Sequence, residues 1–132
     1  MTSMNNEEAR AREKKLVDMN LVRVVPGTPL RIVYFDVSKN VIGTPQVWLR
    51  LFNESGKTVR AYKILASLYD DFSRPACLGN RSQQILTSQE ENIRPGSVRE
   101  GGWTLYTCDT ATRFAFTVTE VVFTDGSSWR GQ

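Results

Sequence analysis

Histidine is absent from this chain of 132 residues, and cysteine occurs only twice. The lack of histidine removes the commonest general base and the commonest metal-ligating side chain. A Ser–His or Cys–His nucleophilic site is therefore excluded, and no Ser-x-x-Lys sequence offers a lysine base in its place. We predict that the protein is not an enzyme and that it uses no cofactor.

Acidic residues form no recognisable catalytic or metal site either. Asp70 and Asp71 are adjacent, and neighbouring side chains in a loop usually point apart, so we interpret them as solvated turn charges. Calcium would need these two residues to gather with Asp109 and Asp125 at one end of the fold. The Asp-x-Asp spacing typical of calcium loops is missing, and we predict no metal site.

Charge and hydropathy patterns exclude two further classes of protein. The 17 basic and 14 acidic residues give a net charge of +3, with no Lys/Arg-rich run outside the N-terminal segment. Nucleic-acid binding needs a concentrated basic stripe, so we expect none. No run approaches the roughly 20 apolar residues of a membrane span. No signal peptide is visible, so we expect a periplasmic or secreted location if a leader was removed and a cytoplasmic one otherwise.

The two cysteines, Cys77 and Cys108, lack the paired spacing of a zinc site. They either form a disulfide or remain free thiols, and two cysteines alone do not identify the compartment. A disulfide would close a loop of about 30 residues and contribute roughly 3–4 kcal/mol in the chain-entropy model.

Residues 5–19 are the only helical candidate. Asn5 or Asn6 is placed to cap the helix, and basic residues crowd its last turn. Its apolar face is thin, with Leu16 and Met19 as the only large members. Three interpretations stay open: a solvated or disordered leader, a helix docked on a neighbouring surface, and a basic helix on a membrane surface. We assign residues 1–19 to this charged segment and residues 20–132 to a β domain.

Short β-type runs separated by turn signals fill the rest of the chain. The predicted strands are 21–25, 30–37, 47–52, 58–69, about 84–86, 98–106 and 112–124, with a closing hairpin strand at 127–130. Such strands without intervening helices predict an all-β fold, an antiparallel β-sandwich of about seven to eight strands. A β-barrel is the second choice.

The long strand at 112–124 contains an irregularity that the sequence predicts. Phe114, Phe116 and Val118 alternate with polar residues, as in a half-buried strand. Glu120 then falls in the apolar row, so we expect a β-bulge or register change near it. Asp125-Gly126 follows, which predicts a hairpin with a type I′ turn.

Several segments resemble bacterial immunoglobulin-like domains. Residues 47–62 followed by 68–70, the Ile93-Arg94-Pro95-Gly96-Ser97 loop, and residues 118–129 carry the resemblance. The last of these is similar to the Val-x-Phe-x-Asp-Gly-x-x-Trp hairpin that ends uncharacterised members of this group. The resemblance implies an immunoglobulin-like sandwich, often of the bacterial envelope or secreted. It implies no catalytic residues.

The clearest functional signal is the strand at 47–52, which is apolar on both faces. One face should form the core, and the other carries Trp48, Arg50 and Phe52. Exposed patches of large side chains commonly mark interfaces, so these three residues are our predicted binding site. The alternative is that the N-terminal segment or residues 70–97 cover this face.

The predicted function is a non-catalytic protein-interaction or structural module of a bacterial envelope or extracellular assembly, acting through a protein partner or self-assembly. The alternative is a module that binds carbohydrate or a surface polymer by stacking on Trp48, Trp103 or Trp129. Trp103 and Trp129 are better explained as core residues whose indole N–H groups bond to backbone. A small-molecule ligand is not expected.

Overall fold

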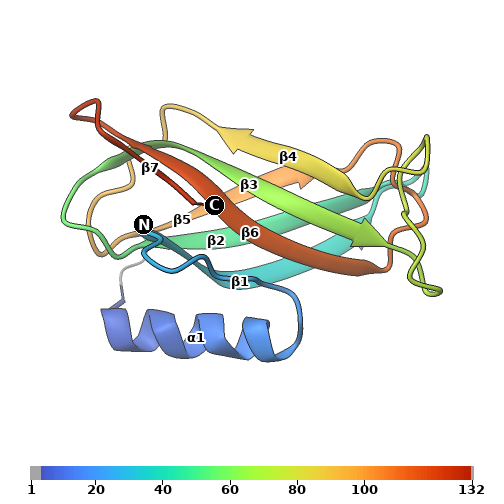
Figure 1. The fold of residues 1–132 in the computed structure, drawn as a ribbon, viewed down its shortest axis with the longest axis horizontal. Helices are drawn as coiled ribbons and strands as arrows, with labels where there is room; N and C mark the ends of the chain where they lie inside the picture. Colours follow the sequence, from blue (N-terminus) through green and yellow to red (C-terminus); the bar gives the residue numbers. More distant parts are fainter. Residues whose placement is uncertain (1–3, 132) are drawn as a thin grey trace.

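This computed structural model describes residues 4–131 of the chain, which contain one helix and seven strands joined by turns and loops. Residues 1–3 and 132 of the predicted segments lie outside it. The elements are α1 (Asn6–Asp18), β1 (Leu30–Lys39), β2 (Pro45–Asn53), β3 (Val59–Tyr69), β4 (Gln83–Ser88), β5 (Val98–Thr104), β6 (Arg113–Phe123) and β7 (Ser128–Arg130). The strands pair antiparallel in a three-stranded sheet, β1-β2-β5, and a four-stranded sheet, β4-β3-β6-β7. The predicted all-β sandwich is confirmed (Figure 1).

The core lies between the two sheets and is built by alternate residues of each strand. In β3 the row formed by Tyr62, Ile64, Ala66 and Leu68 is buried, because side chains two residues apart in a strand share a face. The row of β2 that begins at Val47 is buried in the same way. Burial of these inner rows is the main source of stability, since each large apolar side chain removed from water contributes about 1.5–3 kcal/mol.

The predicted irregularity in β6 is a β-bulge at Thr119. Adjacent residues of β3 pair with Val118 and Glu120, which leaves Thr119 as an extra residue in β6. The bulge exchanges the two faces of the strand. Phe116 points into the core before it, and Val121 does so after it, although the two are five positions apart and would face opposite sides of a regular strand. Glu120 is thereby turned out of the apolar row.

The hairpin between β6 and β7 is present, but its turn differs from the predicted type I′. Gly126 has a φ of +87°, whereas Asp125 is not among the residues with positive φ. The Gly126 N–H donates to the Phe123 carbonyl over 3.0 Å, and the Phe123 N–H donates to the Ser127 carbonyl over 2.9 Å. The connection therefore has three residues, with glycine in the left-handed position, a common hairpin geometry that needs only one positive φ.

The strand predicted at 21–25 is wrong. These residues make one isolated bridge, in which Val22 lies parallel to Phe116 of β6. The Arg23 N–H donates to the Phe116 carbonyl over 3.0 Å. β7 pairs only with residues 120–122 of β6, so residues 21–23 lie along the part of β6 that β7 does not reach. The segment is too short there to form a ladder.

The N-terminal segment forms a helix that docks on the sandwich, which was one of the three interpretations left open by its sequence. The Asn5 side-chain oxygen accepts a hydrogen bond from the Glu8 N–H over 2.8 Å and caps α1. Ala9 is fully buried and packs in a small apolar cluster with Val33, Phe52 and Val98. α1 therefore covers part of the outer face of the three-stranded sheet, alongside β1 (Figure 1).

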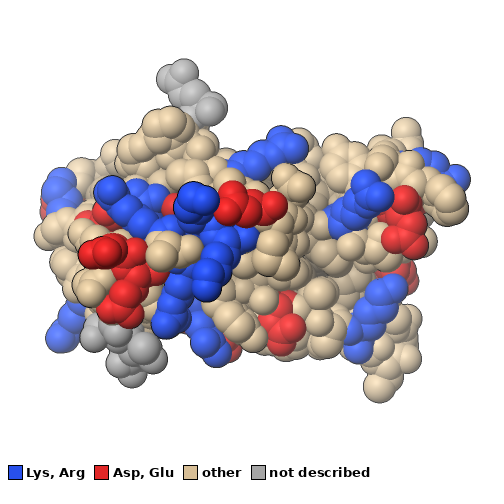
Figure 2. All heavy atoms as spheres, turned by 90° about the horizontal axis from the view of Figure 1, so that it is seen from below, with Lys and Arg blue, Asp and Glu red and all other residues tan. Residues whose placement is uncertain are grey.

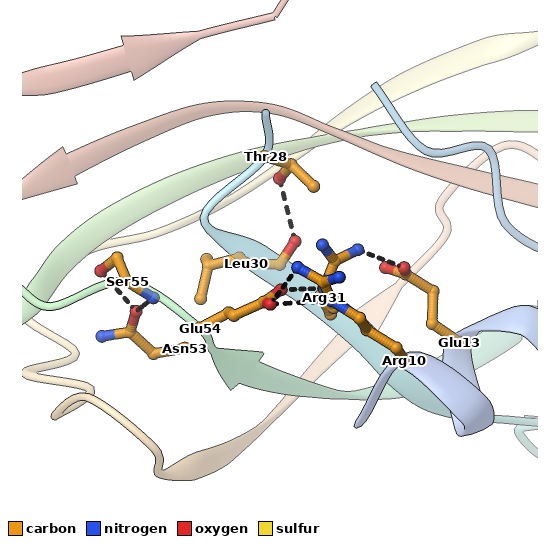
Figure 3. Close-up of polar contacts among 8 residues, drawn as sticks. All are labelled: Arg10, Glu13, Thr28, Leu30, Arg31, Asn53, Glu54 and Ser55. Atoms are coloured by element: carbon orange, nitrogen blue, oxygen red, sulfur yellow. Dashed lines mark hydrogen bonds and ion pairs between the residues drawn. The ribbon is translucent and has the colours of Figure 1, made fainter. Parts of the chain in front are cut away.

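A buried ion network joins α1 to the sandwich (Figure 3). Arg31 of β1 donates from Nη1 to Glu13 of α1 over 2.6 Å and from Nε to Glu54, which follows β2. Arg10 of α1 donates from Nε to the other oxygen of Glu54 over 2.8 Å. Arg10 is largely exposed, whereas the side chains of the other three are at most 15% exposed. The network supplies what the thin apolar face of the helix lacks.

Burial and pairing shift the acids of this network in opposite directions. Burial raises the pKa of Glu13 above its ordinary value, despite the hydrogen bond from Arg31. Burial acts on Glu54 too, but hydrogen bonds from Arg10 and Arg31 outweigh it and lower the pKa of Glu54. Glu54 is thus the better-compensated carboxylate, because it accepts from two guanidinium groups.

Candidate interaction surfaces

Beyond the end of α1, the outer face of the three-stranded sheet displays aromatic and charged side chains. We call Tyr34, Trp48, Arg50, Glu100 and Gly102 the Trp48 face. The Arg50 guanidinium lies 4.1 Å from the centre of the Tyr34 ring, and its Nε lies 3.1 Å from a Glu100 carboxylate oxygen. A Cβ atom added to Gly102 would lie 3.0 Å from the Trp48 indole. The indole therefore rests directly over the glycine backbone, and the face is held in one arrangement by its own contacts.

Phe52 does not belong to this surface, and its prediction as a contact residue is corrected. The side chain is 0% exposed, because α1 lies over it and places Ala9 against it. The structure thus brings Trp48 and Arg50 together on the open part of the sheet and removes the third predicted residue. Tyr34 is a member of this face that the sequence did not predict. The alternation of residues 30–37 places Tyr34 on one face of the strand but does not show which face points into the core.

A hollow of about 230 Å³ lies beside Trp48 and is lined also by Gln46, Gly102, Trp103 and Thr104. Trp103 is partly buried and packs against the core. Its indole N–H donates to the Thr87 carbonyl of β4 over 3.1 Å, which ties β5 to the opposite sheet and agrees with the predicted backbone partner.

Trp129 also packs against the core from β7. A Cβ atom added to Gly131 would lie 2.8 Å from its ring. Of the three tryptophans considered for carbohydrate stacking, only Trp48 lies on the outer face of a sheet.

A second surface lies at the end of the sandwich where three connections meet, residues 40–44, 70–82 and 105–112. We call these connections the loop end. Large apolar side chains at least 70% exposed project from all three of them: Val41, Ile42, Phe72, Leu78 and Tyr106. Their exposure is not readable from hydropathy, because an apolar residue in a loop is more often turned inward. No pattern in the sequence indicates this surface.

The disulfide that the sequence left open is formed within the loop end. Cys77 and Cys108 are joined, with their Cα atoms 4.0 Å apart, and both are buried. The bond ties the second connection to the third. A shallow hollow of about 350 Å³ lies beside it, lined in part by Leu78 and Thr107.

The acidic residues considered for chemistry lie in turns. Both Phe72 and Arg74 donate their backbone N–H groups to Asp70, and these hydrogen bonds, with that of Arg74 first, lower the pKa of Asp70. Asp71 accepts from the Thr112 hydroxyl over 2.7 Å. Asp125 lies in the β6–β7 turn, at the opposite end from both. Within residues 4–131, no group of three or more acidic or cysteine side chains is arranged to hold a metal ion.

Charged side chains are distributed unevenly over the surface. Seen from the side of α1, basic residues gather over the half of the molecule that the helix occupies, with acidic residues among them (Figure 2). No helix in the described part of the chain has both the length and the apolar character needed to cross a membrane.

Comparison with known proteins gives a fold and no function. No family model and no curated protein sequence matches the chain. The X-ray structure of a hypothetical protein from Peptoclostridium difficile 630 is similar, with a TM-score of 0.59 and 12% identity over 80% of this chain and 88% of that chain. The Campylobacter jejuni protein cj0090 matches with a TM-score of 0.48 and 15% identity over 75% of this chain and 96% of its own. At such low identity, the first of these supports the sandwich fold and nothing further.

Proposed function

We propose that this protein is a non-catalytic interaction module, an immunoglobulin-like sandwich that binds a protein partner through the Trp48 face. The strand order supports the immunoglobulin-like assignment. In constant-type immunoglobulin domains the fourth strand pairs with the fifth; here β4 pairs with β3 and lies in the sheet of β6 and β7. The other strands support the assignment, because β1-β2-β5 corresponds to the order of strands A, B and E, and β3-β6-β7 to that of C, F and G.

The observation that carries the proposal is the grouping of the partly exposed Trp48 and Tyr34 with the exposed Arg50 on one sheet face. Trp, Tyr and Arg are the residue types most enriched at the energetic centres of protein interfaces. They lie on a sheet face whose other half α1 covers with an apolar cluster and ion pairs. The contacts of Arg50 with Tyr34 and Glu100 hold the surface in place before a partner arrives, which lowers the entropy lost on binding.

Several observations support a role in an oxidising compartment and without catalysis. A disulfide in a small domain is typical of envelope and secreted proteins. Asp70 accepts hydrogen bonds within its own turn, and Asp71 accepts from Thr112 of the connection before β6, which supports a structural role for both.

The test is affinity capture from envelope and soluble fractions of the source organism, with wild-type protein and Trp48→Ala as baits. The matched control is Ile85→Ala, since Ile85 is 59% exposed on β4 of the other sheet. A partner retained by the wild type and the control, but lost with Trp48→Ala, supports the proposal. A partner retained equally by all three baits, with all three folded by circular dichroism, contradicts it.

Gly102→Ala provides a second variant that keeps the tryptophan. Its new methyl group would contact the Trp48 ring and displace it by a few tenths of an ångström. We expect a weakened, measurable interaction in a binding titration with the captured partner. Equal affinity for Gly102→Ala and Trp48→Ala would mean that the position of the indole decides binding as much as its presence.

A second candidate function is carbohydrate binding at the hollow beside Trp48. An aromatic plane flanked by the polar groups of Gln46 and Thr104 is the chemistry that a sugar ring uses, with stacking on one side and hydrogen bonds at the rim. Titration with soluble glycans would shift the tryptophan fluorescence of the wild type and not that of Trp48→Ala. A flat titration across neutral and acidic glycans contradicts this candidate.

A further inference from the structure

The loop end differs from an ordinary surface in how its apolar side chains are presented. Val41, Ile42, Phe72, Leu78 and Tyr106 are spread over three connections, and Leu78 is the one of the five that lines the hollow beside the disulfide. Val41 is as exposed as in an extended peptide, with a relative exposure of 103%. The protein therefore presents separate protruding tips at this end.

The tips are held firmly by their connections. The Asn40 side-chain oxygen accepts from the Ile42 and Thr44 N–H groups over 3.1 and 2.9 Å. Asp70 accepts from the Phe72 N–H over 2.9 Å. The disulfide fixes the connection that carries Leu78. Exposure of these side chains is thus built into ordered turns.

Basic side chains stand at the bases of the same connections. Lys39, Arg74, Arg81 and Arg113 are exposed there, against three aspartates at 70, 71 and 109. Arg74 pairs with Asp70 and Lys39 donates to the Asp109 carbonyl, each over 3.0 Å, and the four cations exceed the three aspartates by one charge. The whole chain carries a net charge of +3. The result is a set of apolar tips backed by cations.

We propose that the loop end docks on the surface of a membrane containing anionic lipids, with the five apolar side chains inserted at the level of the headgroups. Apolar tips enter the interface without needing a shaped partner, because lipids deform around them. Long basic side chains behind the tips reach the phosphates. Aromatic residues such as Phe72 and Tyr106 favour this interfacial region. A protein partner would instead need a set of matching pockets.

The test is sedimentation of the full-length protein with vesicles of phosphatidylcholine, with and without phosphatidylglycerol. We expect binding to the anionic vesicles that weakens as salt rises. The double variant Ile42→Ser/Phe72→Ser should bind at least about tenfold more weakly, since each large apolar side chain taken from water contributes roughly that factor. Lys39→Gln/Arg81→Gln should lose the preference for anionic vesicles and keep the apolar contribution.

Ile85→Ser is the matched control, because it removes an exposed apolar side chain from a sheet face outside the loop end. Equal loss of binding with Ile85→Ser, or no binding of the wild type to either vesicle, overturns the proposal. Sedimentation velocity without lipid tests whether a second copy of the chain binds the loop end instead. A dimer that Ile42→Ser/Phe72→Ser abolishes would assign the loop end to a second copy of the chain and would also overturn it.

Tryptophan fluorescence of a Phe72→Trp variant distinguishes insertion of this side chain from nonspecific adsorption of the protein to vesicles. We expect its difference spectrum against the wild type to shift to shorter wavelength on adding anionic vesicles; an unchanged spectrum contradicts insertion. Trp48→Ala should bind vesicles like the wild type, so this proposal and the proposed partner binding can fail separately.

Discussion

Asn53 is a buried polar residue whose side-chain hydrogen bonds connect two segments of the fold. Its side chain is 0% exposed. Its amide nitrogen donates to the carbonyls of Lys57 and Ile93 over 2.7 and 2.8 Å. Its amide oxygen accepts from the N–H and the hydroxyl of Ser55 over 2.9 and 2.7 Å. One side chain thus shapes the turn after β2 and ties it to the segment before β5.

The change Asn53→Asp keeps the shape of the side chain and replaces the donor by an oxygen. Two hydrogen bonds are lost, at roughly 1 kcal/mol each. The Ile93 carbonyl still accepts from the Val59 N–H over 2.9 Å, but the new oxygen is buried against two carbonyl oxygens without a donor, at a further cost of about 1–3 kcal/mol. We expect the free energy of unfolding at neutral pH to fall by about 3–5 kcal/mol.

Urea denaturation followed by tryptophan fluorescence measures this change, with Asn53→Ala as the comparison. Burial beside two carbonyls raises the pKa of the introduced carboxyl above its unfolded value. The folded state then binds the proton more tightly, so the deficit of Asn53→Asp should shrink as pH falls from 7 towards 4. The stability deficit of Asn53→Ala should not change over this pH range, because alanine carries no titrating group. A loss below about 1 kcal/mol, or a deficit independent of pH, would refute the assignment of the amide nitrogen as donor to both carbonyls.

Three further predictions concern the ion network and the disulfide. Arg31→Met should lower the free energy of unfolding by about 3–5 kcal/mol in a urea titration, because it leaves Glu13 and Glu54 buried without their shared partner; removal of the arginine at no cost would contradict the network. The Cys77→Ser/Cys108→Ser double variant should be less stable by roughly 3–4 kcal/mol at most, measured by thermal unfolding without reductant; an unchanged midpoint would mean that the bond does not constrain the unfolded chain. The pKa of Glu54 is lower in the folded protein than its unfolded value near 4.5, so Glu54 stabilises the fold above that pH. This contribution is lost as pH falls through the folded pKa. The raised pKa of Glu13 acts in the opposite sense. Glu54→Gln should therefore flatten the loss of stability measured below about pH 4.5, and an unchanged acid limb would remove Glu54 as its source.

Strand positions and the bulge were predictable where the sequence itself records which side of the strand is buried. In β6 the apolar row is interrupted at Glu120 and resumes at Val121, and this offset by one is what an extra residue produces. The docking of α1 was beyond this kind of reasoning. It depends on Glu13 meeting Arg31 and Glu54, and no periodicity pairs charges that lie far apart in the sequence.

The candidate site was predictable only in part for the same reason. The two-sided apolar pattern of residues 47–52 left open whether the outer face is exposed or covered, and it could not show that each holds for one part of the strand. α1 reaches Phe52 and leaves Trp48 open. The loop end shows the opposite limit. Val41 and Ile42 fall in a predicted connection, where hydropathy does not tell which way a side chain faces, and the turn around Asn40 directs them outward.

The position of β6 has a consequence for how the chain is made in the cell. β6 pairs with β3 along its length and supplies inner residues such as Phe114 and Phe116, yet it leaves the ribosome only after β4 and β5. β3 therefore emerges long before its main partner and must wait with one edge unpaired. Cys77 and Cys108 both precede β6, so oxidation can join them before the sheet is complete. Closure of this sandwich therefore waits for β6, and a nascent chain stalled before residue 113 would depend on a chaperone to keep its open edge from pairing elsewhere.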